Sequence, residues 1–254
     1  MKIIAVYSIK GGVGKTSTAV NFAWYAAKKD IYTSLIDLDP QCACMQMLPQ
    51  PSKDTSNISL GQWKKIDEKE KQDYFHFYLN KKLRFFQGDQ SFRKLDTILE
   101  SGEKGKGQLK ELIPSASKKT KLQIIDSPPG LGRLSEALLF YADAILVPLN
   151  PSELSLKTLQ QLYDFMALKG IDQSKLITFF NRVSYRKKMH KKFMQASPLP
   201  LEKRLSSYIP TAFAVEAMSD RRMPCVVSVR RTKLSSAYEL LFDEVLRYTM
   251  VSSV

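Results

Sequence analysis

The residues best suited to chemistry lie near the amino end, where a glycine-rich segment ends in a lysine and two hydroxyl residues. Residues 10–17 read Lys-Gly-Gly-Val-Gly-Lys-Thr-Ser, after an apolar run at 3–7 and before a helix-like run at 17–29. Glycines let backbone N–H groups turn toward an anion, and the helix start adds the positive end of its dipole. The order strand, loop and helix predicts a phosphate-binding loop rather than a turn without a ligand, with Lys15 on the phosphates and Thr16 on Mg²⁺. The residues expected to bind the nucleotide here are Gly11, Gly12, Val13, Gly14, Lys15, Thr16 and Ser17.

Aspartates close two further apolar runs and supply oxygen ligands of the kind that a magnesium nucleotide needs. Asp37 and Asp39 lie in the sequence Leu-Ile-Asp-Leu-Asp-Pro-Gln, and Asp126 ends the run at 122–126. At alternate positions of a strand, Asp37 and Asp39 are expected to point to the same face. Taken alone, an aspartate at a strand end is more often a turn or cap residue. Beside a phosphate-binding loop, it is interpreted as a ligand of the metal or of the attacking water.

Strand-like runs alternate with helix-like runs along the chain, which predicts an α/β fold with a mostly parallel, twisted sheet and helices on both faces. We expect one P-loop ATPase domain over residues 1–254, and we expect the segment 49–80 to form two helices over the nucleotide face. A turn is expected at 102–107, and Thr232 is the expected N-cap of the last helix. The predicted strands are 3–8, 33–37, 83–86, 122–126, 144–149 and 176–181, and the other predicted helices are 134–142, 152–168 and 233–248.

The glycine-rich segment departs from the usual P-loop pattern G-x-x-x-x-G-K-[ST], because Ile9 stands where that pattern has its first glycine, and Lys10 follows it. The pattern K-G-G-x-G-K-[ST], with D-x-D-P-Q at 37–41 and D-x-P-P-x-L at 126–131, resembles the deviant Walker A ATPases of the ParA/MinD superfamily, and most of all the ParA-type partition ATPases. The resemblance implies that Lys10 crosses a dimer interface to the nucleotide of the other subunit. It also implies that Asp39 belongs to switch I and positions the water, that Asp126 holds Mg²⁺, and that Asp37 supports the metal shell.

Later parts of the chain match the same family more loosely. Asn181 and Arg182 close an apolar strand where family members contact the adenine base, and Pro210 lies where the family has a residue near the base. Each of these three matches is also compatible with ordinary packing. The chain departs from the family at Cys42 and Cys44, where small residues of the glycine type are commoner.

The chain is strongly basic, with a formal net charge of +14 from 39 Lys and Arg against 25 Asp and Glu. Such an excess indicates a polyanionic partner, either DNA or an acidic membrane surface. The alternative is a solvated basic face without a partner. Family resemblance favours nonspecific DNA binding by an ATP-dependent homodimer in the cytoplasm on the nucleoid, with a ParB-like centromere-binding protein as the partner. The candidate DNA contacts are Lys187, Lys188, Arg221, Arg222, Arg230 and Arg231.

Three other classes of protein share the nucleotide loop. A MinD-like membrane switch requires a basic amphipathic C-terminal helix, whereas residues 248–254 contain no Lys or Arg. Iron–sulfur reductases require paired cluster cysteines, and the three cysteines here, Cys42, Cys44 and Cys225, lack that spacing. A nucleotide-gated scaffold of a conjugation or secretion machine stays open, and steady-state ATP turnover would distinguish it. Membrane attachment is therefore not expected, since no apolar run approaches 18 residues and no secretory signal is found.

Overall fold

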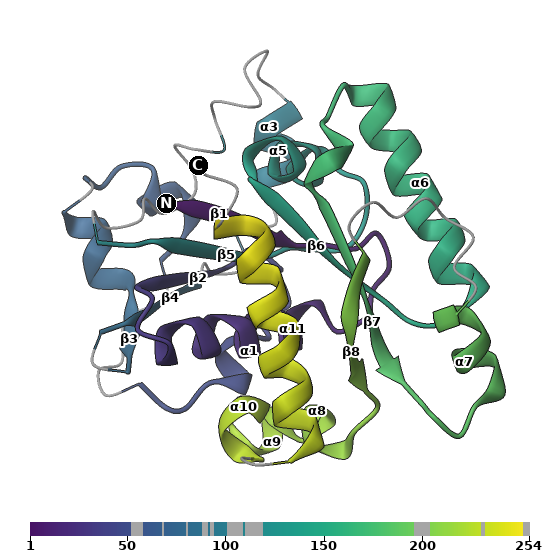
Figure 1. Ribbon diagram of the computed structural model, residues 1–254. Coiled ribbons are helices and arrows are strands. Elements are labelled where there is room, and N and C mark those ends of the chain that lie inside the picture. Colours follow the sequence, from purple (N-terminus) through teal and green to yellow (C-terminus); the bar gives the residue numbers. More distant parts are fainter. Residues whose placement is uncertain are drawn as a thin grey trace.

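The central sheet explains how residues from distant parts of the sequence meet at one edge. In this computed structural model, eight strands form one sheet in the order β3-β4-β2-β5-β1-β6-β7-β8 (Figure 1). Neighbouring strands are parallel except β3 and β4, which pair antiparallel. The α/β fold that the sequence predicts is confirmed. The strands are β1 (Lys2–Val6), β2 (Thr33–Asp37), β3 (His76–Tyr78), β4 (Leu83–Gln87), β5 (Leu122–Asp126), β6 (Ala144–Leu149), β7 (Leu176–Val183) and β8 (Arg204–Pro210). The structure describes residues 1–51, 58–67, 69–79, 81–87, 91, 94–100, 109, 119–195, 204–229 and 232–250.

Helices cover both faces of the sheet, and each face has its own hydrophobic core. Along β1, Ile4 and Val6 pack in the core beneath α1 and α11, whereas Ile3 and Ala5 pack in the core beneath α5 and α6. This alternation is what a strand buried on both faces produces. Figure 1 shows α11 in front of the sheet, beside α1. The helices are α1 (Lys15–Lys28), α2 (Leu60–Trp63), α3 (Leu95–Glu100), α5 (Arg133–Tyr141), α6 (Glu153–Lys169), α7 (Lys188–Gln195), α8 (Phe213–Glu216), α9 (Met218–Arg221), α10 (Cys225–Ser228) and α11 (Lys233–Met250).

The predicted helix boundaries agree with the structure to within two residues, and the local capping explains why. The hydroxyl of Ser152 accepts a hydrogen bond from the Ser155 amide at the start of α6, and Gly170 adopts the left-handed conformation at its end. Thr232 accepts a hydrogen bond from the amide of Ser235 at 3.3 Å, which is the capping contact expected before α11.

The segment 49–80 is the main error in the predicted fold. Instead of two helices, its described residues form the single turn α2, a 3₁₀ turn at Glu70–Tyr74 and the edge strand β3. In β3, His76 and Tyr78 are buried while Phe77 is 40% exposed, so the alternation is real but only three residues long. Strand β8 was also not predicted, because polar and apolar residues mix along this edge strand. The predicted turn at 102–107 lies outside the described residues.

The aromatic contact between α1 and α11 provides a test of the packing that supports the phosphate loop. Phe22 and Phe242 stack with ring centroids 4.5 Å apart, and both are fully buried. We expect Phe242→Ala to lower the free energy of unfolding by about 3–5 kcal/mol, because it removes a stacked ring and leaves a cavity. Urea unfolding measures this loss. The matched control is Leu240→Ala on the same helix, where the side chain is 61% exposed and the change should stay within about 0.5 kcal/mol. Equal effects of the two substitutions would contradict the packing described.

Candidate nucleotide-binding site

The glycine-rich loop has two positions whose backbone conformation favours glycine. Gly12 and Gly14 have φ of 72° and 91°, in the left-handed region. A Cβ atom on Gly14 would clash with Nδ2 of Asn181, so a side chain there would have to displace Asn181. Helix α1 begins at Lys15, two residues earlier than the sequence suggests, and no side chain caps its first turn. The first-turn amides of α1 are therefore directed at the loop, as in an anion-binding helix start.

A cavity of about 680 Å³ lies over this loop and gathers residues from five distant segments. Its walls come from the loop, the segment after β2, the segment after β5, the end of β7 and the segment from β8 into α8. The predicted site residues that line it are Gly11, Gly12, Gly14, Lys15, Thr16, Ser17, Asp39, Asn181, Arg182 and Pro210. The lining residues that sequence reasoning missed are Pro40, Gln41, Ala43, Met47, Pro128, Pro129, Thr211, Ala212, Val215 and Glu216. Gln41 belongs to the D-x-D-P-Q motif, and Pro128 and Pro129 belong to the D-x-P-P-x-L motif, so these three were recognisable, whereas Val215 carries no sequence signal.

The two lysines of the loop lie in different surroundings. Lys15 is only 6% exposed, and its Nζ donates a hydrogen bond to the carbonyl oxygen of Lys10 at 3.4 Å. Burial lowers the pKa of Lys15, while the negative charges of Asp126 and Asp39 raise it. Lys10 is half-buried and is not among the residues that line the cavity. Lys15 is thus held inside the site, whereas Lys10 lies outside the cavity lining.

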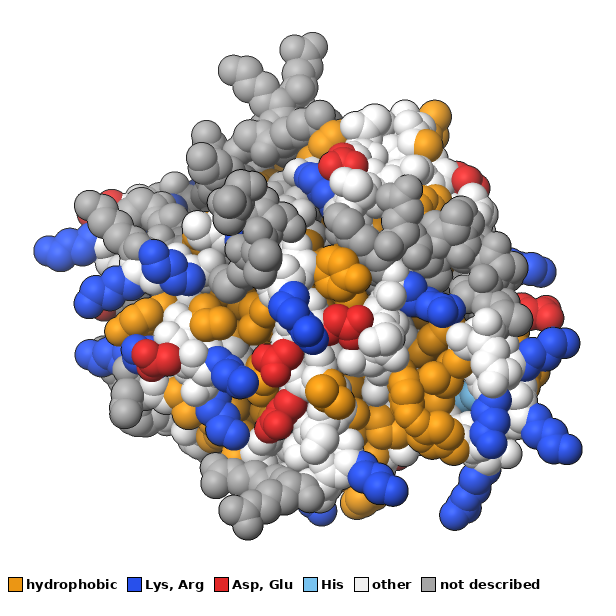
Figure 2. All heavy atoms as spheres, in the orientation of Figure 1, with side chains coloured by type: hydrophobic (Ala, Val, Ile, Leu, Met, Phe, Trp, Pro, Cys, Tyr) orange, Lys and Arg blue, Asp and Glu red, His pale blue; other side chains and the backbone are white. Residues whose placement is uncertain are grey.

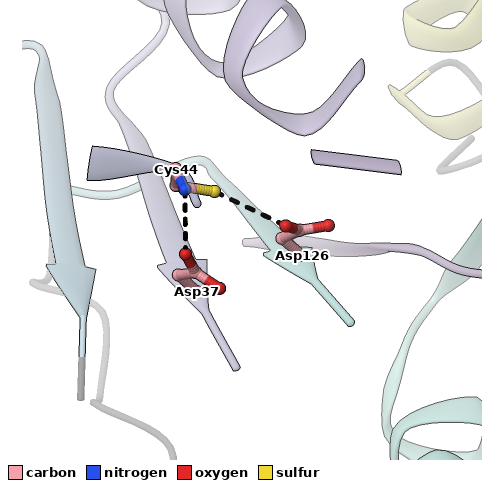
Figure 3. A group of neighbouring side chains, drawn as sticks. All are labelled: Asp37, Cys44 and Asp126. Atoms are coloured by element: carbon pink, nitrogen blue, oxygen red, sulfur yellow. Dashed lines mark hydrogen bonds between the residues drawn. The ribbon is translucent and has the colours of Figure 1, made fainter. Parts of the chain in front are cut away.

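Asp37 and Asp126 form a buried carboxylate pair at neighbouring strand ends (Figure 3). Asp37 ends β2 and Asp126 ends β5, and the two are direct partners in the parallel register. Both are almost completely buried, with exposed fractions of 2% and 0%. Asp37 accepts hydrogen bonds from the amides of Asp39 at 3.0 Å and Cys44 at 3.1 Å. The strand ends at Asp37, so Asp39 lies in the following loop and lines the cavity instead of sharing a buried strand face with Asp37.

Burial is the largest cause of the raised pKa values of Asp37 and Asp126. It raises the pKa of Asp37 to about 7, although two backbone amides act in the opposite direction. Burial, followed by the neighbouring charge of Asp37, raises the pKa of Asp126 well above its ordinary value. The nearby Thr16 hydroxyl and Lys15 favour the ionised form. Even so, Oδ1 of Asp126 has no hydrogen-bond partner of normal geometry in the part of the chain that the structure describes. A buried carboxylate oxygen without a partner, beside a threonine hydroxyl, is the kind of donor set that a hard divalent cation uses.

The end of β7 is attached directly to the phosphate loop. Asn181 Nδ2 donates to the carbonyl oxygen of Val13 at 2.8 Å, and Arg182 Nη1 donates to that of Gly12 at 3.0 Å. Arg182 has φ of 57° and also forms an ion pair with Glu216 at 3.5 Å. The two residues expected at the adenine base therefore border the cavity and also hold the loop, while Pro210 lies on the cavity wall.

The candidate DNA contacts occupy two separate places in the structure. Lys187 and Lys188 are exposed at the start of α7, and Arg221 and Arg222 are exposed at the end of α9. Figure 1 shows α7 well apart from α9, with β8 between them. In Figure 2, Lys and Arg side chains extend from the α7 region beside an apolar area, and others gather at the opposite edge near β3 and β4. The last two candidates, Arg230 and Arg231, lie outside the described residues.

Comparison with known proteins places the chain in a family. A family model described as "AAA domain" matches residues 1–177. The chromosome partitioning protein ParA of Myxococcus xanthus is 28% identical over 161 residues, which are 63% of this chain and 56% of that protein. The aligned part thus spans little more than half of that relative. The loop, the two aspartate segments and these matches together show that the chain belongs to the ParA/MinD superfamily of ATPases.

Solved structures agree in fold across most of the chain. The ATP complex of an McdA variant from Cyanothece superposes with a TM-score of 0.78 at 20% identity, covering 96% of each chain. Cobyrinic acid a,c-diamide synthase of Mycobacterium smegmatis with ADP and magnesium gives a TM-score of 0.76 at 20% identity, covering 98% of this chain and 95% of that one. The same fold thus holds ATP in one of these proteins and ADP with magnesium in the other. Within the described residues, no helix is both long enough and apolar enough to cross a membrane.

The buried carboxylate pair predicts a pH dependence of stability. Unfolded aspartates have pKa values near 4, whereas Asp37 retains its proton up to about pH 7 in the folded chain. The folded state thus holds more protons in this range, so stability falls as the pH rises from about 4 to about 7. We expect Asp126→Asn to raise the free energy of unfolding at about pH 8 by about 1–2 kcal/mol and to flatten this fall.

Urea unfolding of the nucleotide-free protein at about pH 5 and about pH 8 measures both effects. The control is Asp164→Asn, an exposed aspartate on α6 that should change neither the stability nor its pH dependence. A lower stability of Asp126→Asn at the higher pH would show that the carboxylate is needed for folding rather than for binding.

Proposed function

We propose that this chain, as one domain over residues 1–254, is a ParA-type partition ATPase. It dimerises when it binds ATP and Mg²⁺, binds DNA without sequence specificity, and hydrolyses ATP under the control of a ParB-like partner on the nucleoid. The observation that supports this most is the cavity in which the glycine-rich loop, Asp39 and the end of β7 meet. Its extent, from the phosphate loop to the base-side residues, suits a nucleotide.

In the proposed site, each residue has a distinct task. The amides of residues 11–17 and the Lys15 ammonium hold the phosphates, and Asn181, Arg182 and Pro210 border the base. Thr16 and Asp126 hold Mg²⁺, with Asp37 beside them. When bound, the ion neutralises phosphate charge and orients the terminal phosphoryl group. Asp39 lies in the cavity wall, in the loop after β2, and orients the attacking water.

Lys10 is proposed to act in the partner's site. Its side chain does not line the cavity of its own chain, and its carbonyl group already accepts the hydrogen bond of Lys15. A second lysine at the loop entrance is thus available to a nucleotide across a dimer interface. ATP would then favour the dimer because each bound nucleotide gains one cation from the other chain.

The two loop lysines can be separated experimentally. We expect Lys15→Ala to weaken ATP binding by on the order of 100-fold, because it removes a buried cation from the phosphates. Lys10→Ala should retain ATP binding and lose ATP-dependent dimerisation. Calorimetry with magnesium ATP measures the first property, and size-exclusion chromatography with light scattering measures the second. A Lys10→Ala protein that dimerises with ATP as the wild type does would contradict the proposed role.

DNA binding is supported by the net charge and by exposed basic pairs on α7 and α9. Each Lys or Arg that meets a phosphate releases counterions, so the affinity depends steeply on salt and little on sequence. The separation of the two pairs in one chain suggests that DNA lies across a larger surface, such as that of the ATP-bound dimer.

Charge removal at one of these pairs tests this. We expect the double substitution Lys187→Ala and Lys188→Ala to weaken binding of duplex DNA in the presence of ATP and to reduce the slope of log affinity against log salt by about 2. The matched control is Lys64→Ala with Lys65→Ala, an exposed adjacent pair in the segment that joins β2 to β3. Fluorescence anisotropy at several salt concentrations compares the variants. An equal loss in the control would assign the effect to net charge alone, against a defined DNA surface.

A further inference from the structure

Cys44 brings a sulfur atom between the two buried carboxylates. Its Sγ donates to Oδ2 of Asp126 at 3.6 Å, and its amide donates to Oδ2 of Asp37 (Figure 3). One candidate ligand atom from each of the three residues lies within 4.8 Å of the others, and all three residues are buried. The chain thus has two carboxylates and a thiol converging at one point, where the family resemblance leads one to expect a small residue.

The Asp126 carboxylate also has an oxygen without a partner. Among the described residues, Oδ1 of Asp126, the oxygen that Cys44 does not contact, has no hydrogen-bond partner although the residue is 0% exposed. A buried, unpartnered carboxylate oxygen is costly and is usually satisfied by a cation or a donor. Asp37 keeps its two backbone donors and still has free lone pairs, so its carboxylate can accept a metal without losing these contacts.

We propose that Asp37, Cys44 and Asp126 form a binding site for a thiophilic divalent cation such as Zn²⁺. Zinc takes sulfur and carboxylate oxygen in a tetrahedral arrangement, in which ligand atoms lie about 3.5 Å apart. The ligand atoms here lie within 4.8 Å of one another, so they need to approach by about 1.3 Å at most. The cation replaces the thiol proton, which is released to solvent. Mg²⁺ prefers oxygen ligands only and gains nothing from the sulfur.

The segment before Cys44 forms part of the wall of the nucleotide cavity. Asp39, Pro40, Gln41 and Ala43 line the cavity and connect it in sequence to Cys44. Within this segment Cys42 has φ of 52°, a left-handed position that makes the chain turn. A cation held by Asp126 and Cys44 removes Asp126 from Mg²⁺, so zinc acts as an inhibitor of turnover. This consequence rests on the proposed ATPase function, whereas the binding itself does not.

Cadmium titration of the nucleotide-free protein tests the site directly, because a cadmium–thiolate bond gives an ultraviolet charge-transfer band. We expect one Cd²⁺ per chain, displaced by Zn²⁺ and unaffected by millimolar Mg²⁺. Cys44→Ala should weaken Cd²⁺ binding about 100-fold or more and abolish the band. Cys44→Ser, which keeps a polar oxygen, should also lose the band. The matched control is Cys42→Ala, two residues away, which should keep both the band and the affinity.

The possible results distinguish a failure of the proposed metal site from a failure of the proposed ATPase function. A wild-type protein without the band, a band that persists in Cys44→Ala, or a band lost in Cys42→Ala overturns the metal site. Circular dichroism and calorimetry with magnesium ATP are run on every variant to show that it is folded and still binds nucleotide. If Cd²⁺ binds but magnesium ATP does not, the metal site is supported and the ATPase proposal fails. If magnesium ATP binds but Cd²⁺ does not, the metal site fails and the ATPase proposal is supported. Zinc inhibition of ATP turnover that is lost in Cys44→Ala would complete the support.

Discussion

The parallel register that sets Asp37 beside Asp126 is the constraint on which the site depends. Two carboxylates at adjacent strand ends, both nearly without solvent, repel one another and are poorly solvated. Of the described cations, Lys15 is the one whose charge acts on Asp126, and it is itself buried and attached to the loop. The carboxylate pair is therefore electrostatically unfavourable until a cation binds beside it. The same pair thus lowers the stability of the folded chain and favours cation binding.

The phosphate loop is held by residues of β7, which lies on the other side of β1 from β5 and β2 in the sheet. Asn181 and Arg182 at the end of β7 hold the carbonyl groups of Val13 and Gly12, so the loop amides remain free to face the cavity. The space at Gly14 is filled by the Asn181 side chain, which links the glycine requirement to a residue far away in sequence. The end of β7 and the glycine-rich loop are thus one connected structure, and a ligand of the cavity that contacts both would stabilise the loop as a whole.

The sequence alone was enough to predict the strands that are buried on both faces and the residues of the glycine-rich loop. Apolar runs such as 122–126 predicted their strands because a strand covered on both faces needs no polar alternation. The prediction from sequence failed at β3 and β8. The first is only three residues long and the second mixes polar and apolar residues, so both strands depend on pairing at a sheet edge. The convergence of Cys44 with two aspartates was also outside its reach, because that geometry depends on the turn after Asp39 rather than on residue type. Val215 and Glu216 line the cavity only because α8 follows directly on the end of β8, beside β7.

The distribution of positive charge constrains how a polyanion can be bound. The basic pairs on α7 and α9 are separated by β8, and further Lys and Arg side chains lie near β3 and β4 (Figure 2). A rigid duplex contacts charges that lie along one line or groove, so pairs on different parts of one chain add little to each other. Arg182 shows a further limit, because its guanidinium is already engaged by Gly12 and Glu216 and contributes less to an external anion. The two basic pairs of one chain lie apart. Nucleotide-dependent dimerisation would therefore favour DNA binding if it aligns the basic pairs of two chains along one surface.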